Sequence, residues 1–244
     1  MSDADKRSAN YGGRFDEHTK AMGLKRTFVF FSGLFLFACA TSVHAPLPIK
    51  TPTYTAQIET AIKGRFQNHL SLCPGIRISN APDATPDGAI AAYPAHVKVR
   101  GLALAVAPVE KGCLSSGFGP RQLKGQPMRP HRGLDIAWAW PTDVYAAAAG
   151  TVVNVFYTAS YGKTLVLDHG AGVYTLYAHL DSYDDAATLG ARLEAGARLG
   201  VMGTTASPRV RRHLHYEILT GDYDPRRNVR KLQALNAFDL PSAG

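Results

Sequence analysis

The sequence predicts a mainly β protein, an antiparallel β-sheet or sandwich with a small helical N-terminal segment. From about Val97 onward, short apolar runs follow one another closely, with glycines between them and little room for helices. Runs of this kind, separated by turn-forming residues, are typical of all-β sheets, sandwiches and barrels. The 244 residues leave room for one sizeable domain and one small one.

The expected elements can be placed in order along the chain. Residues 54–71 are expected to form a helix, because four apolar side chains recur at every fourth position and would share one stripe. A segment rich in Pro, Ala, Asp and Gly at 74–95 is expected to be a linker or irregular loop. Strands are then expected at Val97–Val99, Leu102–Val106, Val144–Tyr157, Lys163–Leu167, Val173–Leu180, Arg198–Met202 and His215–Leu219.

The N-terminus resembles an export signal. Lys25 and Arg26 precede an apolar run from Phe28 to Ala40, which has the length of a signal-peptide core and is short for a membrane span. Small residues follow, and Val43 and Ala45 fit the rule for cleavage after Ala45.

Two other interpretations of this segment stay open. Leu36–Cys39 resembles a lipobox, in which Cys39 would be lipidated and would anchor the protein to a membrane. An uncleaved anchor helix is the third interpretation. Residues 1–45 are therefore expected to be a signal peptide, lipoprotein signal or anchor, and the protein is expected in the periplasm, the cell envelope or outside the cell.

The cysteines and the charge fit an exported chain. Beyond the signal, Cys73 and Cys113 remain, as one disulfide or as two separate buried thiols. The net charge of +8 falls to +6 without residues 1–45, because 21 Lys/Arg and 15 Asp/Glu then remain. This excess favours an anionic partner such as a cell-wall polymer or membrane surface, although a solvated basic face is the plainer explanation. No nucleic-acid-binding motif is present, and no such partner is expected.

Histidines supply the candidate chemistry. Five of the nine lie between residues 131 and 215. His213 and His215 are two apart, so on a strand both rings point to the same face, with Leu214 and Tyr216 on the other. Glu217 continues the row of His213 and His215 and is expected to orient a ligand from behind.

A carboxylate accompanies the histidines. His131 and Asp135 are four apart, and Gly133 between them favours a bent loop over a helix. Two imidazoles, one carboxylate and an open position suit a tetrahedral zinc ion that activates water. His179 and His213 are spare candidates for acid–base work, and no His-Glu-x-x-His motif offers a glutamate base. His169 is interpreted as a turn residue.

These motifs together resemble the lysostaphin-type (LytM-like) zinc metallopeptidases, which cut peptides of bacterial cell walls. The resemblance covers about Val106 to Leu232. It is carried by Ser115–Gly119, His131–Ala137, Val144–Gly150, Tyr161-Gly162, Asp168–Gly170, Tyr174–Leu180, the glycines at 190, 196, 200 and 203, and His213–Ile218.

The resemblance implies a fold, a ligand set and an activity. It implies an antiparallel β domain with a groove, built on the duplicated hybrid motif of LytM-like proteins. It implies that His131, Asp135 and His215 bind Zn²⁺, and that His179 and His213 are catalytic. The implied activity is a zinc metalloendopeptidase acting on peptidoglycan.

The expected organisation has four parts. The signal segment 1–45 precedes a small N-terminal helix and linker at 46–96. The LytM-like metallopeptidase domain is expected at 97–235, and a C-terminal tail at 236–244. Two stretches depart from the family pattern, namely the approach Ala206–Arg212 and the long insert Gln122–Arg129, which could cover the cleft.

Two other functions remain open on the sequence alone. Some relatives lose the metal ligands and regulate cell-wall amidases, but all five polar residues are retained here. A cupin-like iron oxygenase also combines histidines with a carboxylate, although its usual motif lacks the four-residue step from His131 to Asp135.

Overall fold

The computed structural model describes residues 65–123, 125–206, 210–225 and 229–243. The signal segment, Cys39 and the predicted helix up to residue 64 lie outside the described residues. Within the described residues no helix is long and apolar enough to cross a bilayer.

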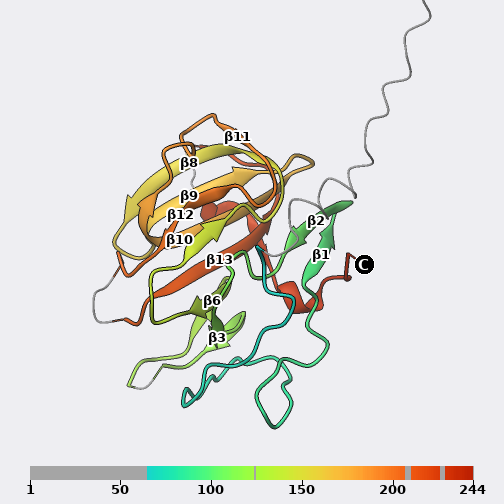
Figure 1. Cartoon of the computed structure of the whole chain (residues 1–244), viewed down its shortest axis with the longest axis vertical. Helices are drawn as coiled ribbons and strands as arrows, with labels where there is room; N and C mark the ends of the chain where they lie inside the picture. The colour runs from blue at the N-terminus through green and yellow to red at the C-terminus, as the bar shows by residue number, and fades with distance from the viewer. Residues whose placement is uncertain (1–64, 124, 207–209, 226–228, 244) are drawn as a thin grey trace, which may run out of the picture. The chain divides into compact units, whose positions relative to one another are not determined.

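The fold is antiparallel β, which confirms the predicted class. Figure 1 shows the strands of the main sheet curving around one another, and this sheet has ten strands with the central order β11-β8-β9-β10-β13-β6-β3. These strands are β3 (Cys113–Ser116), β6 (Leu134–Ala137), β8 (Gly150–Thr158), β9 (Gly162–Asp168), β10 (Val173–Tyr183), β11 (Arg192–Leu193) and β13 (His213–Thr220).

The remaining elements extend this sheet or form hairpins beside it. β12 (Arg198–Met202) pairs with β10 and with β7 (Asp143–Tyr145), and β14 (Gln233–Leu235) pairs with β13. Two hairpins stand apart: β1 (His96–Val99) with β2 (Leu102–Ala105), and β4 (Gly119–Arg121) with β5 (Arg129–His131). Short 3-10 helices η1 (Val229–Lys231) and η2 (Ala237–Asp239) lie near the C-terminus.

Each predicted strand has a counterpart in the structure, with one division. The expected strand at 144–157 is two strands, β7 and β8, separated by the alanine-rich turn at 146–149. The strands that the sequence did not reveal are β3, β4, β5, β6, β11 and β14, which span only two to four residues each. A strand of so few residues carries little alternation, so only some short strands, such as β1 and β2, can be recognised.

The N-terminal strap, residues 65–95, packs on the sheet without forming a helix. Its first seven residues belong to the predicted helix 54–71, and this described part of the prediction is wrong. Leu70 is buried there, and Leu72 forms a parallel bridge to Leu114 of β3. Backbone groups of the strap thus bond to the edge of the sheet, whereas in a helix they would have bonded to one another.

A disulfide fixes the strap to the sheet. Cys73 and Cys113 are joined, with their Cα atoms 4.9 Å apart, so the two-thiol alternative does not hold. The Cys73 amide donates to the Leu114 carbonyl and the Leu114 amide donates to the Ser71 carbonyl. Residues 74–95 continue as turns and isolated bridges.

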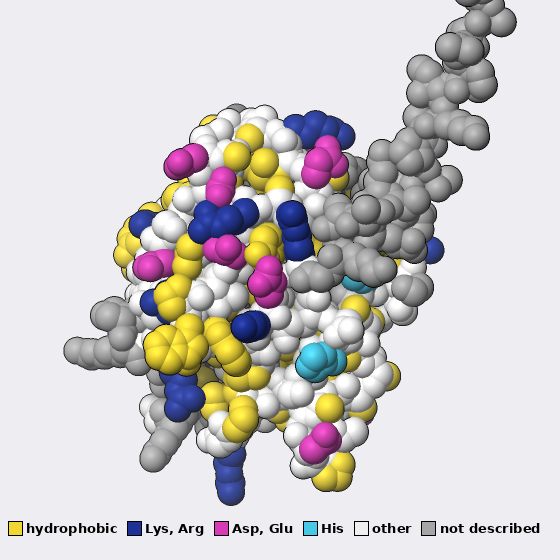
Figure 2. Space-filling model, viewed as in Figure 1, with side chains coloured by type: hydrophobic (Ala, Val, Ile, Leu, Met, Phe, Trp, Pro, Cys, Tyr) yellow, Lys and Arg dark blue, Asp and Glu magenta, His cyan; other side chains and the backbone are white. Residues whose placement is uncertain are grey.

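The C-terminus lies beside the β1–β2 hairpin (Figure 1), where Ser242 bridges to Val97. Charged side chains of both signs are interspersed over the face shown in Figure 2. That mixture is typical of a solvated surface.

Candidate metal centre

Strand β13 presents two histidines to one site. His215 pairs with Asp135 of β6 and with Ala178 of β10, so it lies in the middle of the sheet. Because side chains alternate along a strand, His213, His215 and Glu217 share a face, while Leu214 and Tyr216 are buried in the hydrophobic core. The alternation predicted for this segment is confirmed.

A tight turn brings His131 to Asp135. His131 ends β5 and Asp135 lies in β6, with Gly133 between them, so the bent-loop alternative holds. A Cβ on Gly133 would lie 2.1 Å from the Tyr216 carbonyl oxygen. Only glycine allows the turn to approach β13 this closely, and this approach places the carboxylate beside His215.

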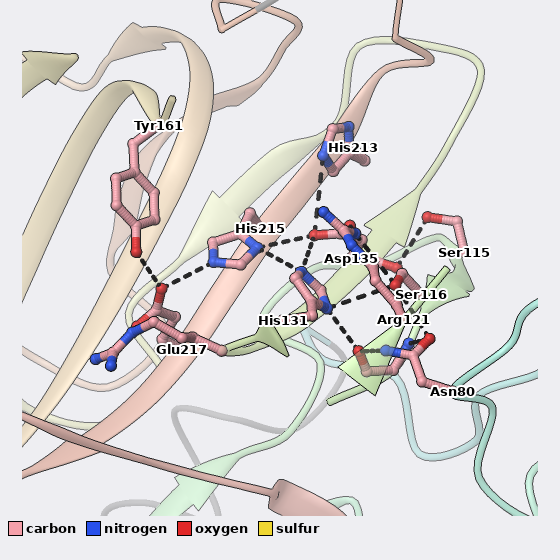
Figure 3. Close-up of polar contacts among 12 residues, drawn as sticks. Asn80, Ser115, Ser116, Arg121, His131, Asp135, Tyr161, His213, His215 and Glu217 are labelled. Atoms are coloured by element: carbon pink, nitrogen blue, oxygen red, sulfur yellow. Dashed lines mark hydrogen bonds and ion pairs between the residues drawn. The ribbon is translucent and has the colours of Figure 1, made fainter. Parts of the chain in front are cut away.

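Three acceptor atoms converge in the buried centre (Figure 3). Asp135 Oδ1 lies 2.8 Å from His215 Nδ1 and 3.0 Å from His131 Nε2, and the two nitrogens are 3.0 Å apart. The outer ring nitrogens already donate elsewhere: His131 Nδ1 to the Gly117 carbonyl at 2.5 Å and His215 Nε2 to Glu217 at 2.9 Å. In neutral rings, the inward nitrogens therefore carry lone pairs.

Such an arrangement is suited to a cation at its centre. Two lone pairs and a carboxylate repel one another when no donor stands between them. Among the described residues, these three are the one group of His, Cys, Asp and Glu side chains that could hold an ion, with ligand atoms within 4.8 Å of one another. Imidazole nitrogen and carboxylate oxygen are the donor set of catalytic zinc sites.

Electrostatics respond to the same crowding. Burial would raise the pKa of Asp135, but hydrogen bonds from His131 and His215 hold it well below its usual value. Burial would lower the pKa of His215, but hydrogen bonds to Asp135 and Glu217 raise it to about 9. These shifts apply to rings that share a proton with Asp135. With neutral rings, a bound cation would take the place of that proton, so the centre favours positive charge where the three atoms meet.

His179 and His213, the other two candidate site histidines, lie side by side next to this centre. The centroids of their rings are 4.5 Å apart. His213 Nδ1 donates to the Arg211 carbonyl at 2.8 Å, which leaves Nε2 as an acceptor 3.9 Å from Asp135 Oδ1. Burial lowers the pKa of both rings, with that of His179 falling to about 3.

His179 occupies a strained bulge of β10. Its φ is 62°, in the left-handed region that non-glycine residues avoid. The pairing of β10 shifts register between Tyr177 and Leu180 on one side and between Leu180 and Ser182 on the other. Bulges of this kind redirect a side chain. Here the bulge places the His179 ring against His213.

A backbone contact holds the bulge in place. Gly203 packs so closely that a Cβ would lie 2.5 Å from the Asp181 nitrogen and 2.7 Å from the His179 oxygen. Gly203 is one of the four glycines that carry the family resemblance, and here the missing side chain allows this close approach. The buried Nδ1 of His179 has no hydrogen-bond partner among the described residues.

Two grooves meet at the centre. The His215 groove, about 480 Å³, is lined by His215, Glu217, Tyr161 and Arg132 among others. The His213 groove, about 580 Å³, is lined by His213, Ser116 and residues of two loops. His179, Asp135, Arg121 and Ser160 line both.

The loops of the His213 groove are those that depart from the family pattern. Leu123, Gln126 and Arg129 of the long insert line the groove, as do Ala206 and Arg211 of the other loop. The described residues of Ala206–Arg212 thus form part of the groove wall. The insert lines the groove as well, in its described part.

Four supporting side chains complete the site. The sequence indicated Glu217, and the contact of this residue with His215 is present. It did not reveal that Tyr161 and Arg132 bond the Glu217 carboxylate at 2.7 and 3.2 Å, or that Arg121 donates to Asp135 Oδ2 at 2.7 Å. Arg121 follows the Ser115–Gly119 motif by two residues, and this proximity was the available signal.

Asn80, from the strap, was also missed. Its Oδ1 accepts from the Gly117 amide at 3.1 Å and from Ser116 Oγ at 3.3 Å, and its Nδ2 donates to the Gly117 carbonyl. That carbonyl is the one that orients His131 (Figure 3). Asn80 lies in a segment that the sequence presents as a linker.

Comparison with known proteins identifies the domain that carries this centre. Residues 129–227 match the model of peptidase family M23. The chain carries an M23 domain. The match includes all five candidate site residues, and it argues against the cupin-like alternative.

Individual relatives share part of their length with the M23 domain. The chain is 36% identical over 116 residues to the peptidoglycan DD-endopeptidase ShyA of Vibrio cholerae, covering 46% of this chain and 26% of ShyA. It is 33% identical over 98 residues to the uncharacterized lipoprotein YgeR of Escherichia coli, covering 40% and 38%. The chain thus spans about a quarter to two fifths of these relatives.

A zinc-containing peptidase from Vibrio cholerae matches with a TM-score of 0.46 and 28% identity over 57% of this chain and 40% of that one.

Proposed function

We propose that this protein is an exported zinc-dependent endopeptidase that hydrolyses peptide cross-links or stem peptides of peptidoglycan. One observation carries the proposal: three buried acceptors, from His131, Asp135 and His215, lie within 3.0 Å of one another with their other contacts already satisfied. The donor set fits zinc, and these three side chains would hold it.

Zinc bound there would supply a Lewis acid for the scissile carbonyl and lower the pKa of a water molecule from ~15.7 toward ~7. The chain supplies the proton transfers. His213 Nε2 is an acceptor, fixed by the Nδ1–H bond to the Arg211 carbonyl, and it faces the centre. It is therefore placed to take a proton from the attacking water.

His179 acts beside His213. Its ring lies against that of His213 and lines both grooves, so a peptide crossing the centre passes it. A neutral ring at this place donates a hydrogen bond to the carbonyl oxygen as the carbonyl becomes tetrahedral, and the proton that His213 took from the water passes to the leaving amine nitrogen when the peptide bond breaks. In this proposal His179 and His213 are the catalytic residues, within a domain at 97–235 that follows the signal and N-terminal segments.

The proposed substrate is supported by relatives of the chain, and the proposed location by a relative and by the N-terminal segment. ShyA is named a peptidoglycan DD-endopeptidase, and the M23 domain here matches part of it. The signal segment supports export, and the lipoprotein YgeR supports the interpretation in which Cys39 is lipidated and anchors the protein to a membrane.

The alternative is a non-catalytic regulator of cell-wall amidases. The intact acceptor triad argues against it, because a regulator has no need of a cation site with two neutral histidines beside it. Metal content separates the two. A purified protein that holds no zinc and cuts no wall peptide, yet stimulates an amidase, would establish the regulator.

The direct test is digestion of purified peptidoglycan by the zinc-loaded protein, with the fragments identified by mass spectrometry. The wild type is expected to release cleaved peptides, and His215→Ala is expected to release none. His69→Ala is the matched control, because His69 is exposed and, among the described residues, its ring forms a hydrogen bond with Asn68 alone. Activity that survives removal of the metal by a chelator would overturn the mechanism.

A further inference from the structure

Two arginines of the His213 groove, Arg129 and Arg211, have guanidinium groups without a partner among the described residues. Arg129 begins β5, and Arg211 stands two residues before β13 begins its row of histidines. Both side chains are exposed, and neither makes a hydrogen bond or ion pair with its guanidinium in the part of the chain that the structure describes. Unpaired guanidinium groups in a groove are available to a ligand.

The His213 groove carries net positive charge, because the third arginine, Arg121, already neutralises the acidic side chain there. Arg121 donates from Nη1 to Asp135 and to Ser116 Oγ at 3.2 Å. Asp135 is the one acidic side chain among the described residues that line the groove, and Arg121 neutralises it. The groove thus differs from the mixed surface of Figure 2.

The other groove is more nearly balanced. It also contains Arg121 with Asp135, and there Arg132 is paired with the buried carboxylate of Glu217. Arg230 is its one arginine without a pairing partner among the described residues. The two grooves therefore offer unequal surroundings to the two halves of a bound peptide.

We propose that the His213 groove is a subsite for a free carboxylate on the peptide substrate, close to the scissile bond. Arg129 and Arg211 would bind that carboxylate from two loops. Guanidinium groups match a carboxylate with paired N–H donors, which an uncharged amide cannot use equally well. Leu123 and Val210, which are 45% and 50% exposed beside them, would contact the aliphatic part of the same residue.

This subsite rests on the proposed endopeptidase activity, and it narrows the substrate class to acidic peptides. The probes are two preparations of the same cross-linked muropeptide, one with free carboxylates and one with these carboxylates converted to amides. Cleavage is followed by chromatography. We expect amidation to reduce kcat/KM by about tenfold, chiefly through KM, as for the loss of a partly exposed charged pair.

The variant Arg129→Gln/Arg211→Gln is expected to cleave both preparations at equal, reduced efficiency. Arg192→Gln is the control, because Arg192 is an exposed arginine on β11 at the far edge of the sheet. Equal cleavage of the two preparations by the wild type overturns the subsite and leaves the endopeptidase intact. Cleavage of neither preparation counts against the endopeptidase itself.

A separate observation concerns the strap. Asn80 bonds both the N–H and the C=O that Gly117 contributes to the backbone, and the Gly117 carbonyl receives the Nδ1–H of His131. A Cβ on Gly117 would lie 2.0 Å from the Asn80 carbonyl oxygen, so the two backbones are in contact. Asn80 is thus one residue removed from the ring of His131.

From this geometry we infer that Asn80 is a positioning residue for the metal centre. It fixes the carbonyl that selects the His131 tautomer with a lone pair on Nε2. The strap that carries it is held seven residues earlier by the Cys73–Cys113 disulfide. The segment before the M23 match is therefore part of the site.

The test measures metal binding in the full-length protein. Asn80→Ala is expected to weaken zinc affinity, measured by chelator competition, by about 10- to 100-fold, the usual effect of losing support behind a ligand. It should also change the visible spectrum of the cobalt-loaded protein, which reports the ligand geometry. Asn80→Asp, which keeps the acceptor, should recover part of the affinity.

Ser79→Ala is the matched control on the same strap, because Ser79 bonds the backbone of Gln122 and, within the described ranges, makes no hydrogen bond with Gly117 or His131. We expect its zinc affinity and its cobalt spectrum to equal those of the wild type. If Asn80→Ala and Asn80→Asp bind metal as Ser79→Ala does, Asn80 has no positioning role.

Discussion

The histidine cluster has a ligand side, with His131 and His215, and a second side, with His179, and the two sides are held in opposite ways. His131 and His215 each donate the outer ring N–H to a fixed partner, the Gly117 carbonyl or Glu217, and these partners are themselves hydrogen-bonded. His179 occupies a left-handed bulge, and its buried Nδ1 has no partner among the described residues. Rigid support is suited to a ligand, whereas strain and an unsatisfied polar atom are typical of a group that acts on substrate.

The sharpest way to break this comparison is to remove one ring from each side. His215→Ala is expected to abolish both zinc binding and peptidoglycan cleavage, because two ligands remain. His179→Ala is expected to keep zinc bound while turnover falls by about 10²-fold or more, as for the loss of an acid–base group. Zinc content and cleavage rate are measured on the same preparations. Loss of zinc from His179→Ala would make that residue a ligand and erase the difference between the sides.

The bulge itself can be disturbed without touching a histidine. In Gly203→Ala the new methyl group would meet backbone atoms of Asp181 and His179, none of which can rotate away. We expect a loss of about 1–3 kcal/mol in the free energy of unfolding, the usual cost of overpacking. Turnover should fall with zinc affinity preserved. Denaturant unfolding and metal titration measure the two effects, and a fall in zinc affinity would show that the bulge supports the ligand side too.

How far the sequence could lead depended on distance along the chain. That the His213 and His215 side chains point to the same face follows from the two-residue alternation of a strand, and Gly133 indicated a turn that brings His131 close to Asp135. The roles of Asn80 and Arg121 were not predicted, because they arise from contacts across 37 and 14 residues, which no local pattern encodes. The described end of the predicted helix was wrong for the same reason, because the Ser71 carbonyl accepts from the Leu114 amide of β3 instead of from a helical neighbour.

A smaller effect is expected from changing Glu217, which supports His215 on the ligand side. This side chain is fully buried and receives bonds from His215, Tyr161 and Arg132. Glu217→Gln keeps the shape but removes the charge that holds the Nε2–H of His215. We expect zinc affinity to fall by about 10-fold, at the lower end of the effects seen for such supporting groups.

The control is Glu194→Gln, since Glu194 is an exposed glutamate in the segment between β11 and β12. Chelator competition on both variants gives the comparison. Equal affinities for Glu217→Gln and wild type would mean that shape alone, without charge, orients His215.

The smallest expected effect concerns backbone strain at Ala171, a residue that lies outside the candidate site. Ala171 has φ 52°, close to the 62° of His179, but it lies exposed in the β9–β10 turn between Gly170 and Gly172. Ala171→Gly removes a left-handed penalty of about 1–2 kcal/mol, partly offset by the greater freedom of glycine when unfolded. We expect a net gain of about 0.5 kcal/mol in the free energy of unfolding with unchanged cleavage. Thermal unfolding and a cleavage assay measure both. A change in cleavage would mean that strain at this turn, and not only at His179, is coupled to the centre.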